Sequence, residues 1–246
     1  MLSIVIPLYN EERRLPKTFE AIKRFASIPT SPSFEVVLVD DGSHDRTAEL
    51  ARAFGAQFES VRLVSHEVNR GKGAAVKTGM IAARGAWRLF LDADMATDLS
   101  EFQKCIPFIA ASTPIIIGSR RIAGAAVQIH QPRLREIMGG AYTFIANLFT
   151  GARVSDFTCG FKCFSATATE AIFSRSRIAR WSYDAEILFL AHRLGLPIHE
   201  IPVVWRNDGA TRVRLWKDTP LAFFDLLFIR IFAFFGFYRL LNNLWF

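Results

Sequence analysis

The sequence predicts an α/β fold built on a mostly parallel, doubly wound sheet. In the first half of the chain, short apolar runs alternate with helix-length amphipathic segments, and polar residues follow each run. Nearly continuous Val, Ile, Leu and Phe runs are typical of strands that are covered on both faces. A repeated strand–helix alternation predicts parallel strands that are joined by helical crossovers.

The elements of the first half can be placed by residue. The apolar runs predicted as strands are Ser3–Tyr9, Phe34–Asp40, Val61–His66, Trp87–Asp92 and Ile115–Ser119. The segments predicted as helices are Leu15–Ser27, Asp45–Phe54, Ala74–Ala83 and Leu99–Ala111. Ser43 is predicted to cap the second of these helices, because a serine hydroxyl accepts a hydrogen bond from a free amide at a helix start.

The second half of the chain is less regular. Leu134–Thr150 and Asp184–Leu194 are predicted as helices, Gly160–Phe164 as an edge strand and Ile198–Val204 as a strand. The tail, Pro220–Phe246, is apolar and is predicted to be helical. No repeat or Pro/Ser-rich linker divides the chain. We therefore expect one domain over residues 1–218 and an apolar helical extension over residues 219–246.

The composition narrows the partners. The 246 residues are 51% hydrophobic and include 23 Phe, and the formal charge is +7. That charge indicates a phosphate-bearing partner, which leaves nucleic acid, an anionic membrane and phosphorylated small molecules as alternatives. Cys105, Cys159 and Cys163 are too few for a disulfide framework and are predicted to be buried thiols. The chain opens on an apolar strand rather than a signal peptide, so we expect it to face the cytoplasm.

Ligands of an open parallel sheet bind beyond the carboxyl ends of its strands. Here those ends read Tyr9-Asn10-Glu11, Asp40-Asp41-Gly42-Ser43, Asn69-Arg70-Gly71-Lys72-Gly73, Asp92-Ala93-Asp94 and Gly118-Ser119-Arg120-Arg121. Each of these segments is polar and follows an apolar run. The pattern predicts one shared cleft.

The Asp92-Ala93-Asp94 segment is the candidate metal site. Two carboxylates one residue apart at a strand end can both face a Mg²⁺ or Mn²⁺ ion, and such ions are usually held by one or two carboxylates plus substrate phosphates. The ion would neutralise the charge of a diphosphate leaving group. An Asp-x-Asp pair alone is common by chance, and its place directly after Leu89-Phe90-Leu91 is what favours the metal site.

Two other segments are compatible with nucleotide binding. Asp40 can accept hydrogen bonds from a base or a ribose, although Asp40-Asp41-Gly42-Ser43 also fits a simple turn with a helix cap. Gly71-Lys72-Gly73 can bring amide groups and an ammonium to a phosphate, or it can be a loop before a helix. Neither the Walker spacing nor the dinucleotide fingerprint is present.

Taken together, these motifs resemble, in order and spacing, the catalytic domain of inverting glycosyltransferase family 2, whose members have a GT-A type fold. Further motifs resemble the branch of dolichyl-phosphate β-glucosyltransferases and related polyprenyl-phosphate glycosyltransferases. These further motifs are Glu11–Pro16, Ala82–Gly85, Asp92–Thr97, Gly118–Arg120, Asp156–Lys162 and Trp181–Glu186. The resemblance extends from Ser3 to about Asp218. It departs at Thr158, where relatives often have Gln, and at Met95, where they often have Gly.

The resemblance implies a role for each matching residue. The nucleotide pocket would be lined by Pro7, Tyr9, Glu11 and Asp40, with Lys72 nearby. The metal and the diphosphate would be held by Asp92 and Asp94. The acceptor phosphate or the diphosphate would be bound by Arg120 and by Arg133 or Arg135. The sugar and acceptor site would include Gly160, Phe161 and Lys162, with Asp184 and Glu186 as acidic acceptor-site residues. The catalytic residues would be Asp92, Asp94, Arg120 and Asp184.

The implied reaction is transfer of a hexose, with glucose from UDP-glucose as the expectation, to a dolichyl or undecaprenyl phosphate. A phosphate monoester has a second pKa near 6, so this acceptor is ionised at neutral pH and needs no strong base. A sugar hydroxyl must instead lose a proton, and Asp184 or Glu186 would then be the base. Alternatives are GDP-mannose with a polyprenyl phosphate, a sugar-hydroxyl acceptor, a nucleic-acid-binding module and a structural scaffold. Acidic strand ends argue against nucleic acid.

The tail favours a lipid partner. Leu221–Leu241 approaches the roughly 20 residues that cross a bilayer, but Asp225, Arg230 and Arg239 interrupt it, and an Arg at mid-membrane costs roughly 2.5–3.5 kcal/mol. We expect an interfacial helix at the cytoplasmic face of a membrane. Pairing with the tail of another subunit and spanning the bilayer are the alternatives. Leu134–Thr150 would be a second surface helix. Some arginines are predicted to be solvated or to face lipid headgroups: Arg121, Arg175, Arg177 and Arg180.

Overall fold

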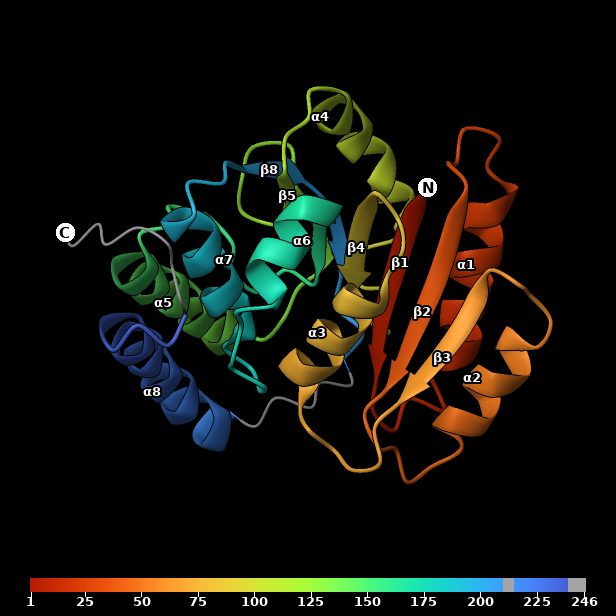
Figure 1. Cartoon of the computed structure of the whole chain (residues 1–246), viewed down its shortest axis with the longest axis horizontal. Helices are drawn as coiled ribbons and strands as arrows, with labels where there is room; N and C mark the ends of the chain where they lie inside the picture. Colours follow the sequence, from red (N-terminus) through yellow and green to blue (C-terminus); the bar gives the residue numbers. More distant parts are fainter. Residues whose placement is uncertain (210–214, 239–246) are drawn as a thin grey trace.

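A computed structural model describes residues 1–209 and 215–238 of the chain. A central sheet with the strand order β3-β2-β1-β4-β7-β5-β8 runs through the molecule (Figure 1). Its strands are β1 (Leu2–Leu8), β2 (Phe34–Asp40), β3 (Val61–Ser65), β4 (Trp87–Leu91), β5 (Ile115–Ser119), β7 (Phe161–Ser165) and β8 (Ile198–Pro202). A separate two-stranded sheet pairs β6 (Ala126–Ile129) with β9 (Val204–Arg206). The predicted α/β fold with a mostly parallel sheet is confirmed.

The sheet differs from the prediction at β7. This strand runs antiparallel to both of its neighbours and lies between β4 and β5, so the expected edge strand is an inner strand. Its residues Phe161, Lys162, Cys163 and Phe164 are all fully buried. A buried carboxylate neutralises the lysine inside the sheet, as described below.

Helices cover both faces of the sheet (Figure 1). One face packs against α1 (Leu15–Ser27), α2 (Thr47–Gly55), the 3₁₀ helix η1 (Leu99–Cys105) and α4 (Ile106–Ala110). The other face packs against α3 (Lys72–Ala82), α6 (Ala166–Phe173) and α7 (Tyr183–Arg193). Outside α7, and in contact with it, lie α5 (Arg133–Thr150) and α8 (Leu215–Phe234).

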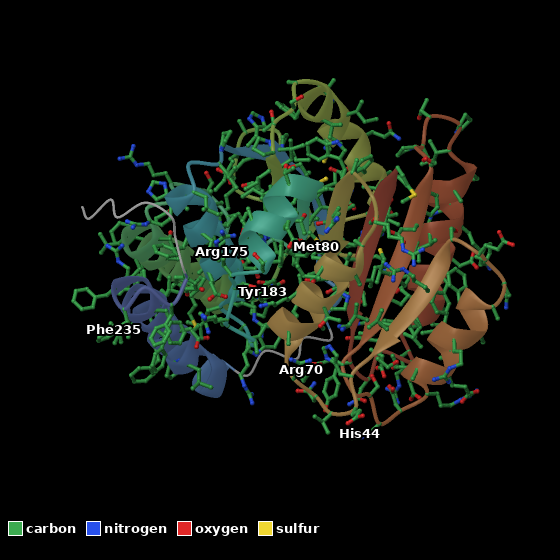
Figure 2. All side chains as sticks on the ribbon, in the orientation of Figure 1. His44, Arg70, Met80, Arg175, Tyr183 and Phe235 are labelled. Carbon is green, nitrogen blue, oxygen red and sulfur yellow. The ribbon has the colours of Figure 1, made fainter. Side chains whose placement is uncertain are left out.

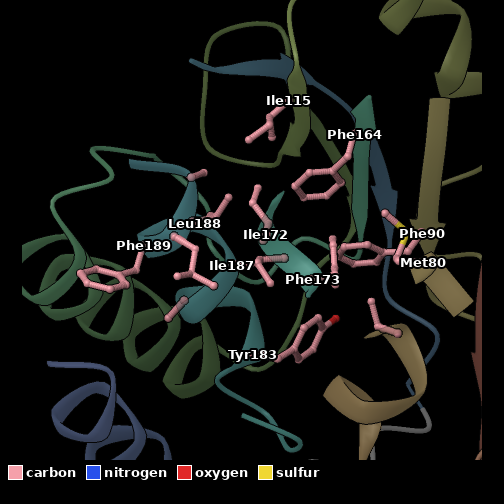
Figure 3. Close-up of a cluster of buried hydrophobic side chains, with 14 of the residues drawn as sticks. Met80, Phe90, Ile115, Phe164, Ile172, Phe173, Tyr183, Ile187, Leu188 and Phe189 are labelled. Carbon is pink, nitrogen blue, oxygen red and sulfur yellow. The ribbon is translucent and has the colours of Figure 1, made fainter. Parts of the chain in front are cut away.

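The alternation of side chains along the strands produces the two halves of the core. Val5, Val37 and Phe90 point to the face of α3, while their neighbours Ile4 and Leu38 point to the face of α1. The half of the core on the α3 face continues into the cluster around Phe164, Phe173, Tyr183 and Phe189 (Figure 3). Because Gly79 has no side chain, α3 lies so close to the sheet that a β-carbon there would overlap Val5.

Most predicted elements are found with ends shifted by a few residues, and three details of the prediction are wrong. The N-cap residue of α2 is Arg46, which makes no side-chain cap, while the Ser43 hydroxyl accepts a hydrogen bond from the Asn10 amide (2.9 Å). The predicted helix Leu99–Ala111 is split into η1 and α4, with Pro107 in the first turn of α4. The predicted strand Ile198–Val204 is divided between β8 and β9 at Val203.

Part of the apolar tail forms α8, which runs from Leu215 to Phe234, so the expected domain boundary after residue 218 falls inside a helix. The predicted tail helix is wrong at residues 235–238, which form a turn. Within the described residues, the structure contains no helix long and apolar enough to cross a membrane. Arg239 and the rest of the predicted tail through Phe246 lie outside the described residues.

Candidate active site

Two loops meet at the carboxyl ends of β1 and β2, where the sequence predicts a nucleotide pocket. The Asn10 side chain accepts a hydrogen bond from the His44 amide (2.8 Å), and Thr47 accepts one from the Glu11 amide (2.6 Å). Asn10 has a φ of 51°, a left-handed conformation that asparagine tolerates better than most residues. Pro7, Tyr9 and Glu11 are partly buried here, and Asp40 is buried beside them at the end of β2. The predicted donor-site residues thus lie together.

Asp41, to which sequence reasoning gave no separate role, organises the neighbouring loop. Its buried carboxylate accepts hydrogen bonds from the amides of Arg70 (2.9 Å) and Gly71 (2.8 Å) and from the Asn69 side chain (2.9 Å). Nδ1 of His66 lies 2.7 Å from the same carboxylate. These bonds fix the loop that leads into α3 and place Lys72 at the start of that helix. The sequence shows that Gly42 follows Asp41, but it does not show that the Asp41 carboxylate contacts residues 25 to 30 positions later.

Lys72 is brought to Asp92 as the sheet-edge argument predicts. Its Nζ lies 2.7 Å from Asp92 Oδ1 and 5.9 Å from the ring centres of both Trp181 and Tyr183. Burial alone would lower the pKa of Lys72, but the charges of Asp92 and Asp184 raise it above its ordinary value. The ammonium therefore stays charged at neutral pH and is available to a phosphate.

Asp92 fits the role of a metal ligand. Its Oδ1 is buried, and no donor among the described residues is aligned with it for a hydrogen bond, although the Lys72 ammonium is near. Gly160 lies directly behind the carboxylate, where a β-carbon would overlap Asp92 Oδ2. The described residues contain no group of three or more His, Cys, Asp or Glu side chains arranged for a metal. The two carboxylates would thus need substrate oxygens to complete a coordination shell.

Asp94 and Met95 complete the turn after β4. Asp94 Oδ1 accepts a hydrogen bond from the Ala96 amide (2.9 Å), and burial together with the charge of Asp92 raises the pKa of Asp94. A bound cation would lower that pKa, because an opposite charge favours the ionised carboxyl. Met95 is buried with a φ of 51°. Glycine adopts that left-handed conformation more readily than methionine does.

Arg120 forms a bidentate ion pair with the fully buried Asp156. Its Nε and one terminal nitrogen lie 2.6 and 2.8 Å from the two carboxylate oxygens, and the terminal nitrogen also donates to the Thr158 hydroxyl (2.8 Å). The guanidinium lies 5.2 Å from the ring centre of Trp205 and is close enough to Asp92 for their charges to interact. Arg120 is thus held in place by Asp156, near Asp92.

Asp184 lies at the start of α7 and pairs with Lys162 on β7. The Lys162 ammonium is fully buried, 2.5 Å from Asp184 Oδ1, and it also donates to the Cys159 carbonyl (2.7 Å). Burial raises the pKa of Asp184, while the charges of Lys162 and Lys72 oppose that rise. The two predicted acceptor-site residues lie close together, but their charged groups form an ion pair with each other.

The remaining predicted acceptor residues occupy different settings. Phe161 is fully buried in the core, and Glu186 is buried with its oxygens accepting hydrogen bonds from the Arg177 and Ile178 amides and the Tyr238 hydroxyl. These settings favour structural roles for both residues. Arg133 and Arg135 lie in the first turn of α5. All three cysteines are buried, as predicted.

This fold and this site define the class of protein: a glycosyltransferase with a GT-A type fold. A model of the glycosyl transferase family 2 matches residues 3–173. The chain belongs to glycosyltransferase family 2.

Within that family the chain is similar to dolichyl-phosphate beta-glucosyltransferases. It is 36% identical over 241 residues to one from Trichomonas vaginalis, which covers 94% of this chain and 73% of the relative. It is 32% identical over 252 residues to the Homo sapiens enzyme, covering 97% of this chain and 78% of the relative. Among solved structures it resembles the Mycobacterium tuberculosis glucosyl-3-phosphoglycerate synthase with Mn²⁺, UDP-glucose and phosphoglyceric acid. That match has a TM-score of 0.68 and 20% identity, and it covers 93% of this chain and 79% of the other.

Proposed function

We propose that the enzyme transfers a glucosyl group from UDP-glucose to a polyprenyl phosphate, dolichyl or undecaprenyl, with inversion at the anomeric carbon. The names of the relatives support this substrate class. The observation that carries it is the placement of Lys72 and Asp92, 2.7 Å apart at the carboxyl end of the sheet, with Arg120 nearby. Cations and carboxylates in one cleft suit the meeting of two phosphate-bearing substrates.

The nucleotide of the donor would lie against Pro7, Tyr9, Glu11 and Asp40, which lie at the carboxyl ends of β1 and β2. The buried Asp40 carboxylate has an acceptor oxygen for a base N–H or a ribose hydroxyl. The charged Lys72 ammonium would then contact the diphosphate. In this arrangement the segments that follow β1 and β2 would bind the nucleoside, and the segment between β3 and α3 would bind the diphosphate.

Asp92 and Asp94 would hold a Mg²⁺ or Mn²⁺ ion together with the diphosphate, because both carboxylates follow β4 and Oδ1 of Asp92 has the Lys72 ammonium beside it but no aligned hydrogen-bond donor among the described residues. When bound, the ion would supply positive charge to the leaving nucleoside diphosphate. The protein contributes the fixed positions of the carboxylates, with Gly160 behind Asp92 and the turn at Met95 setting Asp94. A preorganised site of this kind needs no rearrangement as charge develops.

The acceptor phosphate would be bound by Arg120 and by Arg133 or Arg135 at the start of α5. An ionised phosphate attacks without losing a proton, so catalysis rests on positioning and charge neutralisation. The 2.5 Å ion pair with Lys162 supports this chemistry, because a carboxylate held by a buried ammonium is a weaker base for proton abstraction. Gly160 and Lys162 then shape the acceptor side of the cleft.

A membrane surface would present the acceptor. The helices α5 and α8 lie side by side (Figure 1), and a ring contact joins Tyr142 to Phe223. We call their exposed apolar side chains, with those just after α8, the α5–α8 surface; it comprises Leu134, Ile137, Phe144, Leu148, Leu221, Phe223, Phe224, Leu227, Phe228, Phe234, Phe235 and Phe237. Exposed apolar patches of this kind mark contact surfaces. We propose that this surface dips into the cytoplasmic leaflet; pairing with a second copy is the alternative.

The test is a substrate panel with the purified full chain. UDP- and GDP-sugars are combined with dolichyl or undecaprenyl phosphate, with and without EDTA, and glycolipid is measured. We expect product from UDP-glucose with a polyprenyl phosphate and its loss in EDTA. Transfer from GDP-mannose alone would overturn the donor assignment, transfer only to a sugar hydroxyl would overturn the acceptor assignment, and full activity in EDTA would overturn the metal assignment.

A further inference from the structure

A second cleft lies between α3 and the segment that joins α6 to α7. Its volume is about 660 Å³, which falls within the range of small-molecule sites. From α3 and the loop before it the cleft is lined by Arg70, Ala74, Lys77, Thr78, Ile81 and Ala82. The facing wall is residues 174–179.

The cleft has four cationic side chains in its lining and no acidic one: Arg70, Lys77, Arg175 and Arg177. Throughout the described part of the chain, no carboxylate forms an ion pair with any of them, in contrast to Lys162 and Arg120 in the active site. Cations that converge without counter-charges attract anions from solution.

Most of these side chains donate hydrogen bonds to backbone carbonyls. A carbonyl carries no net charge, so the positive charge stays uncompensated. Lys77 Nζ donates to the Ser176 carbonyl (2.6 Å), and the Arg177 guanidinium donates to the Phe237 carbonyl (2.8 Å). Arg175 donates one terminal nitrogen to the Ala171 carbonyl (2.6 Å). Its Nε is buried and has no acceptor among the described residues. A buried donor without a partner is costly unless a ligand supplies the acceptor.

The cationic side chains of the cleft are close enough for their charges to act on one another. Burial lowers the pKa of Lys77, and the charges of Arg177 and Arg70 lower it further, while Glu186 opposes the shift. Glu186 lies behind the wall, and its oxygens already accept bonds from two amides and from Tyr238. The cleft therefore presents net positive charge.

This cleft is distinct from the nucleotide pocket, although both use α3. Lys72 points to Asp92, and its helix side continues through the buried Val76 and Gly79 toward the sheet. The side chains of Ala74, Lys77, Thr78 and Ile81 occupy the outer side of the helix. Residues three and four apart share one face of a helix, so the two sets point in different directions.

We propose that this cleft binds a phosphate-bearing anion. Arginine guanidinium groups and a lysine ammonium are the side chains that recognise phosphate, through charge-assisted hydrogen bonds. The phosphate can belong to a soluble metabolite or to an anionic lipid headgroup. Arg177 bonds to the Phe237 carbonyl, and Phe237 is in ring contact with Phe235, so the cleft wall is joined to the α5–α8 surface. Phe235 lies at the edge of the molecule (Figure 2).

Titration calorimetry of the full chain with tripolyphosphate tests the proposal. Arg70→Gln is the cleanest variant, because the Arg70 side chain makes no hydrogen bond or ion pair with any residue that the structure describes. We expect this change, and Arg175→Gln, to weaken binding about tenfold, as expected for the loss of a charge-assisted bond. Arg70→Lys, which keeps the charge, should retain most of the affinity. The matched control is Arg52→Gln on the exposed side of α2.

Two further arms complete the experiment. The first arm repeats the titration with excess UDP, which fills the proposed nucleotide pocket, and Arg70→Gln should still weaken tripolyphosphate binding. If UDP abolishes tripolyphosphate binding, the ligand lies in the nucleotide pocket and the proposal is overturned. Sedimentation with phosphatidylcholine vesicles, with or without phosphatidic acid, identifies the source. Binding to phosphatidic acid that Arg70→Gln weakens supports a lipid headgroup, and binding to tripolyphosphate alone supports a soluble ligand. The proposal is overturned when neither probe loses more than twofold affinity in Arg70→Gln and Arg175→Gln.

Discussion

Gly160 lies so close behind Asp92 that a β-carbon on the glycine would overlap the carboxylate oxygen Oδ2. The two residues come from the end of β4 and the start of β7, and the Asp92 amide also donates to the Gly160 carbonyl (3.2 Å). The antiparallel insertion of β7 next to β4 is therefore what sets the position of the candidate metal ligand.

Gly160→Ala should displace the Asp92 carboxylate. We expect kcat/KM to fall about 100-fold, since a shift of about 1 Å at a reacting centre has effects of this size. Gly160 is not in a left-handed conformation, so alanine adds no backbone strain. Steady-state kinetics measures the effect, with Gly55→Ala on α2 as the control, where a β-carbon approaches no atom nearer than 3.4 Å. Unchanged kinetics in Gly160→Ala would show that the Asp92 position does not matter.

Lys72→Met should reduce kcat/KM by about 10²–10³-fold, the usual effect of removing one preorganised charge donor. The ion pair with Asp92 is partly exposed, with side-chain exposures of 26% and 30%, so its removal should change stability by no more than about 1 kcal/mol. Kinetics and urea unfolding separate the two effects. Lys23→Met, from an exposed pair with Glu20, should alter neither.

Asp184→Asn separates the two kinds of acceptor chemistry. With a polyprenyl phosphate we expect kcat to stay within about tenfold, whereas removal of a general base usually costs 10²–10⁴-fold. The variant should also be less stable, because it leaves the buried Lys162 ammonium without its counter-charge, at a cost of about 3–5 kcal/mol. Activity must therefore be measured where circular dichroism shows a folded protein. Near-total loss of phosphate-acceptor activity in that folded variant would make Asp184 a base.

The Arg120–Asp156 pair predicts a pH dependence of stability. Burial would raise the pKa of Asp156, but the hydrogen bonds and charge of Arg120 lower it below its ordinary value. A carboxyl with a lowered pKa stabilises the fold above its unfolded-state pKa of about 3.9, and this contribution is lost as the pH falls through the folded-state pKa.

Asp156→Asn should therefore cost about 3–5 kcal/mol at pH 7, and the difference from the natural protein should shrink below about pH 4. Urea unfolding from pH 7 to pH 3, followed by tryptophan fluorescence, measures both. Glu49→Gln, which breaks an exposed pair with Arg46, is the control and should show little change. A stability difference that stays constant down to pH 3 contradicts the assignment.

The donor side of the site could be predicted from the sequence because it depends on local order. Lys72 and Asp92 each follow an apolar strand, and the carboxyl ends of parallel strands meet at one edge. The acceptor side could not, because its geometry depends on pairings between distant segments. The predicted edge strand is an inner strand, and its buried Lys162 is neutralised by Asp184, 22 residues later. Likewise Asp156, which orients Arg120, lies 36 residues from its partner.

The same limit applies to caps and turns. Ser43 has the right chemistry for an N-cap, but its hydroxyl instead accepts a hydrogen bond from the Asn10 amide, because the loop after β1 lies close to it. Asp41 has the right chemistry for a turn, yet it organises the loop before α3 through its contacts with Arg70 and Gly71. Side chains with several competing donors nearby are assigned only when the tertiary structure brings one of those donors into reach.

The α5–α8 surface predicts reversible membrane binding that depends on its phenylalanines. Phe224 and Phe235 are 60% and 67% exposed, and replacing both with serine removes apolar area that is worth about 25 cal/mol per Å² when buried in lipid. We expect Phe224→Ser/Phe235→Ser to weaken sedimentation with phosphatidylcholine vesicles at least tenfold and to lower turnover of a membrane-embedded acceptor. Turnover of a short-chain soluble acceptor should stay unchanged, because neither phenylalanine belongs to the candidate active site. Ile106→Ser on α4, an exposed apolar residue on the opposite face of the sheet, is the matched control. If vesicle binding survives in the double variant and the oligomeric state changes instead, the surface pairs two copies of the chain.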